Sequence, residues 1–377
     1  MIELIEAVQE NDIKTVKRIL KTHPQHINRH DNYGRNAILY AVIYKMDYIF
    51  EILLANGGCV NSIDSDNGKS CLHYAAENGN LYICKKIVEN GAELSLHDNM
   101  RHTPLHSAIN LDNVKIAEYL IKSGADINNK GLNGATPLHY AAQLGSQSLL
   151  SLLIQYGSVI NTYDQKLHTP FHYACMFGHT VVAYLLIKSG AHIHKTNIEG
   201  YDAIQIAALY NQEEIVAFLL DIGYPVNNIA SNNNSSLHCA IRSANPAIVE
   251  AIIKNGCDIN ITSLYGSPLH EAVNNLALIN LLLEHGANPN IQGKHGYTPL
   301  HILCRLNHKD VIPVFQLLIK HGADMNIQSN NGCTAFHLAI LMNKFDLVKE
   351  MQKIDNINYN IKNKNNESIT DLLSEIA

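Results

Sequence analysis

Apolar residues recur at helical spacing in short segments along the whole chain, and each segment is followed by a residue that stops a helix. In the segment 114–122 the apolar positions are Val114, Ile116, Ala117, Leu120 and Ile121. These positions predict an amphipathic helix over 114–122. Gly124 ends it, because glycine adopts the left-handed conformation of a helix C-terminus without steric cost.

A second helix is predicted ahead of each such segment. Thr103 can accept a hydrogen bond from a free backbone N–H of the first turn, and Pro104 fits where no N–H is needed. In the following unit the paired small residues Ala141 and Ala142 leave room for another helix to pack closely. The sequence therefore predicts units made of a helix, a second helix and a projecting turn.

These units repeat every 33 residues. Histidines at this interval are His73, His106, His139 and His172, with Gln205 in the next position and His238 one period later. Glycines at the same interval are Gly91, Gly124, Gly157, Gly190, Gly223 and Gly256. Two series in one register indicate a solenoid, in which each repeat covers the apolar face of its neighbour.

A local sequence surrounds the histidines. Its clearest copies are Thr103-Pro104-Leu105-His106, Thr136-Pro137-Leu138-His139, Thr169-Pro170-Phe171-His172 and Thr298-Pro299-Leu300-His301. This sequence strongly resembles the ankyrin repeat, whose signature is T-P-L-H-x-A at this period. The resemblance covers essentially the whole chain and implies an all-α ankyrin-repeat solenoid of stacked helix–turn–helix units with projecting β-turn loops.

We expect one ankyrin-repeat array over residues 1–377. It comprises an N-terminal capping repeat over 1–31, ten internal repeats over 32–362 and a truncated C-terminal cap over 363–377. End repeats need a polar outer face because no neighbour covers them.

The repeats become irregular after about residue 260. The spacing from His270 to His301 is 31 residues, and from His301 to His337 it is 36. Pro313 lies in the longer unit, and we expect it in the first turn of a helix because proline breaks a helix interior. The Asn-rich segment 227–234 predicts a looser turn, and a hinge between two sub-arrays is an alternative.

Composition and charge narrow the function. Charged residues make up only 16% of the chain, and the formal net charge of -6 argues against a nucleic-acid backbone as partner, because that affinity comes from clustered Lys and Arg. No secretory signal or membrane-spanning run is visible in the sequence. The eight cysteines include no C-x-x-C pair and indicate free thiols in a reducing compartment, which predicts a cytoplasmic protein.

The 21 histidines and eight cysteines invite a catalytic or metal-binding interpretation. The T-P-L-H histidines are expected to be structural, each bonding to backbone and to the Thr hydroxyl. The alternative is a zinc site formed by His168, His192 and His194, for which no fourth ligand is evident. Cys175 and Cys304 occupy the position of a small core alanine, so we expect packing rather than a nucleophile. We expect no catalytic residue, cofactor or metal.

The ankyrin resemblance implies a partner protein or peptide on the concave face, formed by turn tips and the exposed positions of the first helices. The residues predicted to bind it are Tyr44, Met100, Leu111, Leu132, Leu144, Met176, Phe177, Ile198, Tyr201, Leu209 and Tyr210. Large apolar side chains on a surface are typical of interface centres. The alternative is that these side chains lean into the neighbouring repeat and complete its core.

The predicted function is a non-catalytic scaffold that holds a partner protein, without nucleic-acid binding or membrane insertion and with a monomer favoured. A composition rich in Asn, Ile, Lys and Tyr and lacking Trp is typical of an AT-rich genome. The bare array resembles ankyrin effectors that intracellular bacteria send into host cytosol, and a protist or viral origin fits as well. The alternative function is an enzyme with a site around His295, Cys304, His308 and His321.

Overall fold

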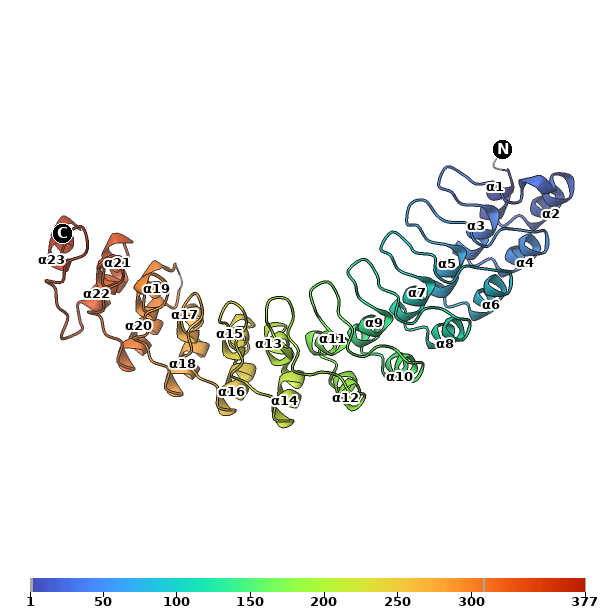
Figure 1. Cartoon of the computed structure of the whole chain (residues 1–377). Coiled ribbons are helices and arrows are strands. Elements are labelled where there is room, and N and C mark those ends of the chain that lie inside the picture. The colour runs from blue at the N-terminus through green and yellow to red at the C-terminus, as the bar shows by residue number, and fades with distance from the viewer. Residues whose placement is uncertain (1–2, 308, 377) are drawn as a thin grey trace. The chain divides into compact units, whose positions relative to one another are not determined.

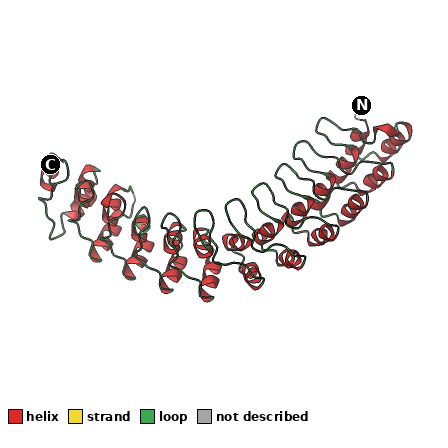
Figure 2. Ribbon diagram, viewed as in Figure 1, coloured by secondary structure: helices red, strands yellow, loops and turns green. Residues whose placement is uncertain are grey.

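The structure, a computed structural model, describes residues 3–307 and 309–376. Over these residues it contains helices, loops and isolated β-bridges but no strand (Figure 2). The chain divides into two compact units, of which unit 1 ends at Ile193 and unit 2 begins at His194. The predicted all-α class is confirmed.

Unit 1 consists of helix pairs in which the second helix follows the first after a short turn (Figure 1). The first helices are α1 (Glu3–Gln9), α3 (Ala37–Ile43), α5 (Cys71–Glu77), α7 (Pro104–Asn110), α9 (Pro137–Leu144) and α11 (Pro170–Phe177). The second helices are α2 (Ile13–Thr22), α4 (Asp47–Ala55), α6 (Leu81–Glu89), α8 (Val114–Lys122), α10 (Gln147–Gln155) and α12 (Thr180–Lys188), and a 3-10 turn, η1 (Pro24–His26), follows α2.

Unit 2 continues the same alternation. Its first helices are α13 (Ala203–Leu209), α15 (Ser236–Arg242), α17 (Pro268–Ala272), α19 (Pro299–Arg305), α21 (Ala335–Leu341) and α23 (Ile369–Ile376). Its second helices are α14 (Glu213–Asp221), α16 (Pro246–Lys254), α18 (Leu276–Glu284), α20 (Val311–Lys320) and α22 (Phe345–Met351), and a 3-10 turn, η2 (Lys294–Gly296), precedes α19.

The core of each unit lies between the two rows of helices. In unit 1, α7 packs against α5, α8 and α9. Leu105 and Ile109 of α7 and Ile116 and Leu120 of α8 are fully or almost fully buried. Since a single helix pair would leave these side chains in water, burial depends on the neighbouring pairs.

The first helices begin as the T-P-L-H chemistry predicts. At α9, Thr136 is the N-cap and Pro137 the first helical residue, and the Nδ1 atom of His139 accepts a hydrogen bond from the Thr136 backbone N–H at 3.0 Å. The Thr136 hydroxyl also lies 2.9 Å from this nitrogen. This reciprocal arrangement is a capping box, with histidine in the place of the usual Glu or Gln.

In several of these histidines the other ring nitrogen joins one repeat to the next. Because Nδ1 accepts, a neutral ring carries its proton on Nε2. The Nε2 atom of His73 donates to the carbonyl oxygen of His102 at 2.9 Å, and that of His139 donates to the carbonyl oxygen of His168 at 3.0 Å. In unit 2, His238 donates to Gly266 in the same way. The predicted structural role of these histidines is confirmed.

The irregular repeats are accommodated at the ends of helices. The shortened repeat has the five-residue α17, and the long repeat has the ten-residue α20, with Pro313 in its first turn. The prediction for Pro313 is confirmed.

The Asn-rich segment 227–234 differs from the looser turn predicted for it. The connection between α14 and α15 has the same length as that between α8 and α9. Its side chains are bonded, since the Nδ2 atom of Asn228 donates to Asp202 Oδ2 at 2.8 Å and that of Asn234 donates to the Tyr201 hydroxyl at 2.9 Å. These bonds order the segment, and the chain divides after Ile193 rather than here.

Candidate functional site: the finger face

The loop from each second helix to the next first helix forms a projecting turn, here called a finger. In unit 1 the fingers project on the side of the first helices, and the second helices line the opposite side (Figure 1). Backbone hydrogen bonds join the finger tips: the N–H of Ser65 donates to the Tyr33 carbonyl at 2.8 Å, and that of Leu132 to the Met100 carbonyl at 2.9 Å. The tips therefore form one ordered row.

Tyrosines brace the fingers against the first helices. The Tyr40 hydroxyl of α3 donates to Asp31 Oδ2 at 2.6 Å, and the Tyr74 hydroxyl of α5 donates to Asp64 Oδ2 at 2.5 Å. Burial and the hydrogen bond to Asp64 raise the pKa of Tyr74 to about 12, so this phenol stays protonated and remains a donor. Burial pushes the pKa of Asp64 upward, but the hydrogen bonds that it accepts bring the pKa below its usual value.

Predicted apolar residues at the ends of the first helices contact the rings of the bracing tyrosines. The ring of Tyr44 stacks on that of Tyr40, with centroids 5.9 Å apart. The ring of Phe177 lies 6.3 Å from that of Tyr173, whose hydroxyl donates to Asp164 in the finger of the same repeat at 3.1 Å. Finger, brace and helix end thus form one surface.

Unit 1 exposes most of the predicted residues on this surface. Tyr44, Met100, Leu111, Leu132, Leu144 and Phe177 are each between 42% and 54% exposed. Met176 is half-buried. We define the finger face of unit 1 by Tyr44, Met100, Leu111, Leu132, Leu144, Met176 and Phe177. Contacts between α7 and α9 and between α9 and α11 place Leu111, Leu144 and Phe177 on successive, adjacent helices.

The predicted residues of unit 2 differ in exposure: two are exposed, one is half-buried and one is buried. Ile198 is 62% exposed at a finger tip, and Tyr210 is 50% exposed at the end of α13. Leu209 is half-buried, as expected for a side chain that partly completes the core.

The prediction for Tyr201 is wrong in its exposure, because this side chain is only 6% exposed. Its hydroxyl accepts hydrogen bonds from the Nδ2 atoms of Asn232 and Asn234, both at 2.9 Å. The residue lies at the base of its finger, directly before the N-cap Asp202, where the side chain packs against the next finger. The Tyr201 side chain therefore joins its own finger to the next one rather than contributing to the exposed surface.

In unit 1, the exposed finger-tip residues Tyr33 and Leu167 were not predicted. Tyr33 is 52% exposed and Leu167 is 45% exposed. The signal for Tyr33 is in the register: it precedes Leu39, which takes the histidine position of its repeat, by the same interval as Met100 precedes His106. Leu167 has no such signal, because it lies one residue further along its turn.

Of the described residues of the alternative enzyme site, Cys304 is the candidate nucleophile, and its surroundings do not favour a thiolate. The Cys304 thiol is fully buried and donates to the Ala335 carbonyl at 3.2 Å. Burial raises the pKa of Cys304 to about 12, so almost no nucleophilic thiolate exists at neutral pH. His295 lies in η2 and His321 is the C-cap of α20, while His308 lies outside the described residues.

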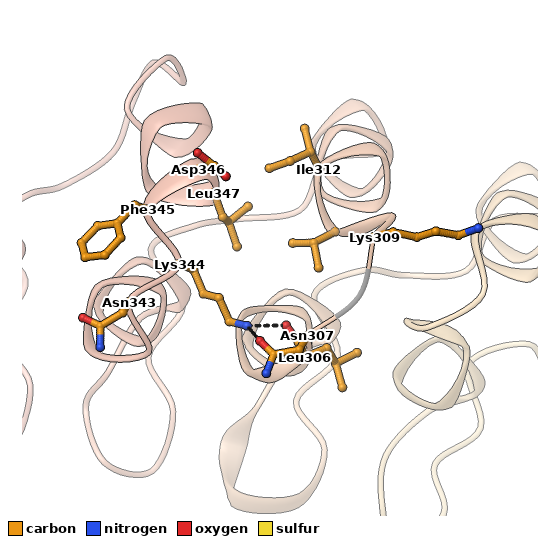
Figure 3. Close-up of a pocket in the computed structure, with 10 residues that line it drawn as sticks. Leu306, Asn307, Lys309, Ile312, Asn343, Lys344, Phe345, Asp346 and Leu347 are labelled. Atoms are coloured by element: carbon orange, nitrogen blue, oxygen red, sulfur yellow. Dashed lines mark hydrogen bonds between the residues drawn. The ribbon is translucent and has the colours of Figure 1, made fainter.

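A hollow of about 590 Å³ lies between the starts of α20 and α22 (Figure 3). Lys344 extends across it, and its Nζ atom donates to the Leu306 carbonyl at 2.7 Å and to the Asn307 side-chain oxygen. Apolar side chains of Ile312 and Leu347 line the rest. Within the described part of the lining there is no histidine or cysteine.

Metal and membrane chemistry find no support in the described residues. No group of three or more His, Cys, Asp or Glu side chains there could hold a metal ion. His168 of the zinc alternative is buried, with Nδ1 3.2 Å from Asp164 Oδ2. No helix in this part of the chain has the length and apolar character that crossing a bilayer requires.

Comparisons with known proteins agree with this geometry. The family model described as ankyrin repeats (3 copies) matches residues 4–98, 60–131, 124–197, 186–263 and 269–363. An ankyrin repeat protein of Fowlpox virus (strain NVSL) is 31% identical over 118 residues, which are 29% of this chain and 35% of that protein.

Two larger proteins match over shorter shares. Diacylglycerol kinase zeta of Rattus norvegicus is 33% identical over 104 residues, which are 27% of this chain and 11% of the kinase. The inactive serine/threonine-protein kinase TEX14 of Bos taurus is 29% identical over 102 residues, 27% of this chain and 7% of that protein. The chain thus spans about a third or less of these relatives. Because the family model covers most of its length, the chain belongs to the ankyrin-repeat family.

Proposed function

We propose that this chain is a protein-interaction scaffold that binds a partner protein or peptide on the finger face of unit 1. Ankyrin repeats are generally protein–protein interaction modules. The observation that carries the proposal is the row formed by Leu111, Leu144 and Phe177, which are 54%, 42% and 42% exposed on neighbouring helices. Side chains of this size seldom stand in a row in water without a use.

The construction of the finger face favours binding. The tip-to-tip hydrogen bonds and the tyrosine braces hold the fingers in place before a partner arrives. A preformed surface loses little conformational entropy on binding. Large apolar residues such as Met100 and Phe177 can then act as anchors in the centre of an interface.

Unit 2 offers a second candidate surface of its own. Ile198 and Tyr210 are exposed, at a finger tip and at the end of a first helix. They form a separate contact region of unit 2 within the proposal.

The proposed partner is a protein of eukaryotic cytosol. The cysteines are free thiols in the described structure, which suits a reducing compartment. A composition typical of an AT-rich genome suits a protein that an intracellular bacterium or a virus directs at its host. We therefore place host-directed effector activity within the proposal, with binding as its physical basis.

Affinity capture from eukaryotic cytosol tests the proposal. The bait is the full chain, compared with the double variant Leu144→Ser with Phe177→Ser. The matched control is Val181→Ser with Tyr184→Ser, two residues of α12 that are 50% and 44% exposed on the second-helix side. We expect a protein that is captured by the native chain and the control but lost with the finger-face variant. Equal capture by all three chains would contradict the proposal.

A further inference from the structure

Unit 2 has a hollow of about 270 Å³ where the finger before α17 meets the finger before α19. Its walls include the rings of Tyr265 and Tyr297 and the side chain of Ile302. Glu271, Lys294 and Arg305 stand among the charged residues of its lining. The hollow is thus apolar in its walls and charged at its edge.

The finger before α17 has a tighter turn than an ordinary finger. In an ordinary finger the N–H of Asn197 donates to the carbonyl of Tyr201, four residues later. In the finger before α17 the N–H of Ser263 donates to Gly266, only three residues later. Tyr265 is 58% exposed at the tip of this turn, and α17 ends at Ala272.

Two cations lie on the aromatic walls. The Lys294 ammonium lies 5.5 Å from the centre of the Tyr265 ring, and the Arg305 guanidinium carbon lies 5.3 Å from the centre of the Tyr297 ring. Such contacts orient the side chains but leave the charges open to an anion. Over the described residues, neither cation forms an ion pair with a carboxylate.

The register of the repeats shows why Arg305 has no carboxylate partner. Arg242 ends α15 as Arg305 ends α19, and its guanidinium forms two hydrogen bonds with the Glu271 carboxylate one repeat later, at 2.9 and 2.7 Å. The residue that follows Arg305 in the position of Glu271 is Leu338, which is buried. Because Glu271 is engaged by Arg242, it does not neutralise the cations of the hollow.

We propose that this hollow binds an acidic segment of a partner polypeptide, with an apolar side chain between Tyr265 and Tyr297 and flanking carboxylates paired with Lys294 and Arg305. The inference rests on the proposed scaffold function and names a partner chemistry for a surface outside unit 1. Aromatic walls favour an apolar or aromatic anchor, and Arg pairs with carboxylates through two hydrogen bonds. A nucleic acid is disfavoured, because Glu271 shares the site and the chain carries a net charge of -6.

Fluorescence anisotropy with synthetic peptides tests the inference on the full chain. The probe is a fluorescein-labelled, capped pentapeptide with one phenylalanine flanked on each side by two glutamates. Two control peptides replace the glutamates by lysine or the phenylalanine by alanine. We expect binding of the first peptide, weakening with added salt, and binding at least about tenfold weaker for each control peptide.

Variants then locate the binding site. Lys294→Ala with Arg305→Ala should weaken binding of the acidic peptide by about tenfold or more and flatten its salt dependence. The matched control is Lys254→Ala with Lys320→Ala, which removes the same charge from exposed positions at the ends of α16 and α20 and should change binding less than about twofold. Tyr265→Ala should weaken the acidic peptide without affecting the circular dichroism spectrum.

Three outcomes would overturn the inference: no binding of the acidic peptide, equal loss with the control pair, or displacement of the peptide by a single-stranded oligonucleotide. None of them bears on unit 1. If the finger face still captures a protein but the acidic peptide does not bind, only the inference about this hollow is wrong. If the acidic peptide binds but the finger-face variant captures the same proteins as the native chain, the proposal for unit 1 is wrong and the inference about the hollow stands.

Discussion

The Nε2 atom of His139 donates a hydrogen bond to the main-chain carbonyl of His168, which lies 3.0 Å away and 29 residues later in the chain. The Nδ1 atom of the same ring accepts from Thr136. One buried side chain thus caps its own helix and holds the finger of the next repeat.

Removing this ring should destabilise unit 1. His139→Ala leaves the buried Thr136 N–H without its partner, removes one of the two hydrogen bonds to the His168 carbonyl and empties the space of a fully buried ring. We expect a loss of about 3 kcal/mol in the free energy of unfolding, measured by urea titration.

The chain supplies the control for this change. Gln205 occupies the same position in its repeat, where its Oε1 atom accepts from the Asp202 N–H and its Nε2 atom donates to the Asn234 carbonyl. His139→Gln should therefore cost less than about 1 kcal/mol. A glutamine variant as unstable as the alanine variant would refute the hydrogen-bonding role.

Stability should fall as the pH drops below the pKa of an unfolded histidine. Burial lowers the pKa of His106 to about 3 and those of His139 and His301 to about 4. The unfolded chain takes up these protons near pH 6.5 while the folded chain does not, so stability is complete above pH 6.5 and is lost between about 6.5 and 4, at up to about 1.4 kcal/mol per pH unit for each histidine.

Urea titrations at several pH values check this dependence. His139→Gln removes one titrating group, so the variant should lose less stability than the native chain between pH 7 and pH 5. Identical slopes for the two chains would show that the buried ring is not responsible.

Two glycines with left-handed backbone should differ in their tolerance of alanine. At Gly124 (φ +100) an added Cβ meets no atom within 4 Å, so Gly124→Ala should cost only about 1 kcal/mol of backbone strain. At Gly34 (φ +72) it would lie 2.8 Å from the Ile63 carbonyl oxygen, and we expect a cost above about 2 kcal/mol. Thermal denaturation of both variants would reveal the difference, and equal costs would argue against tightly packed finger tips.

Cysteine labelling distinguishes a core thiol from a reactive one. Cys59 is exposed and should react with a maleimide within minutes, whereas Cys304, buried and with its pKa raised to about 12, should react only on unfolding. Mass spectrometry of peptides from the labelled native chain gives the order in which the cysteines react. Rapid labelling of Cys304 would revive the enzyme alternative.

The repeat units could be predicted because their signals are local. The helix over 114–122 has the predicted bounds, and Pro313 lies in the first turn of α20. Capping by Thr, Pro and His depends on residues within one turn, so the sequence alone reveals it.

Contacts between fingers could not be predicted in this way. Tyr201 was expected at the surface, yet its burial depends on Asn232 and Asn234 in the next finger. The same contacts order the segment 227–234. A periodic pattern gives the position of a residue in its own repeat but not the packing of its side chain on the neighbour.

The hollow beside Tyr265 shows a second limit. The short spacing from His270 to His301 indicated an irregular repeat, but it did not indicate a hollow lined by two tyrosines. The free charge of Arg305 becomes evident only by comparison with the Arg242–Glu271 pair.

The central claim is that unit 1 binds a partner protein through its finger face. Photo-crosslinking tests this claim most directly. In one chain p-benzoylphenylalanine replaces Phe177 on the finger face, and in another it replaces Val181, which is 50% exposed on the second-helix side of the same repeat. After irradiation in eukaryotic cytosol, the account predicts a discrete crosslinked protein from position 177 and none from position 181. No adduct at 177, or the same adducts from both positions, would contradict it.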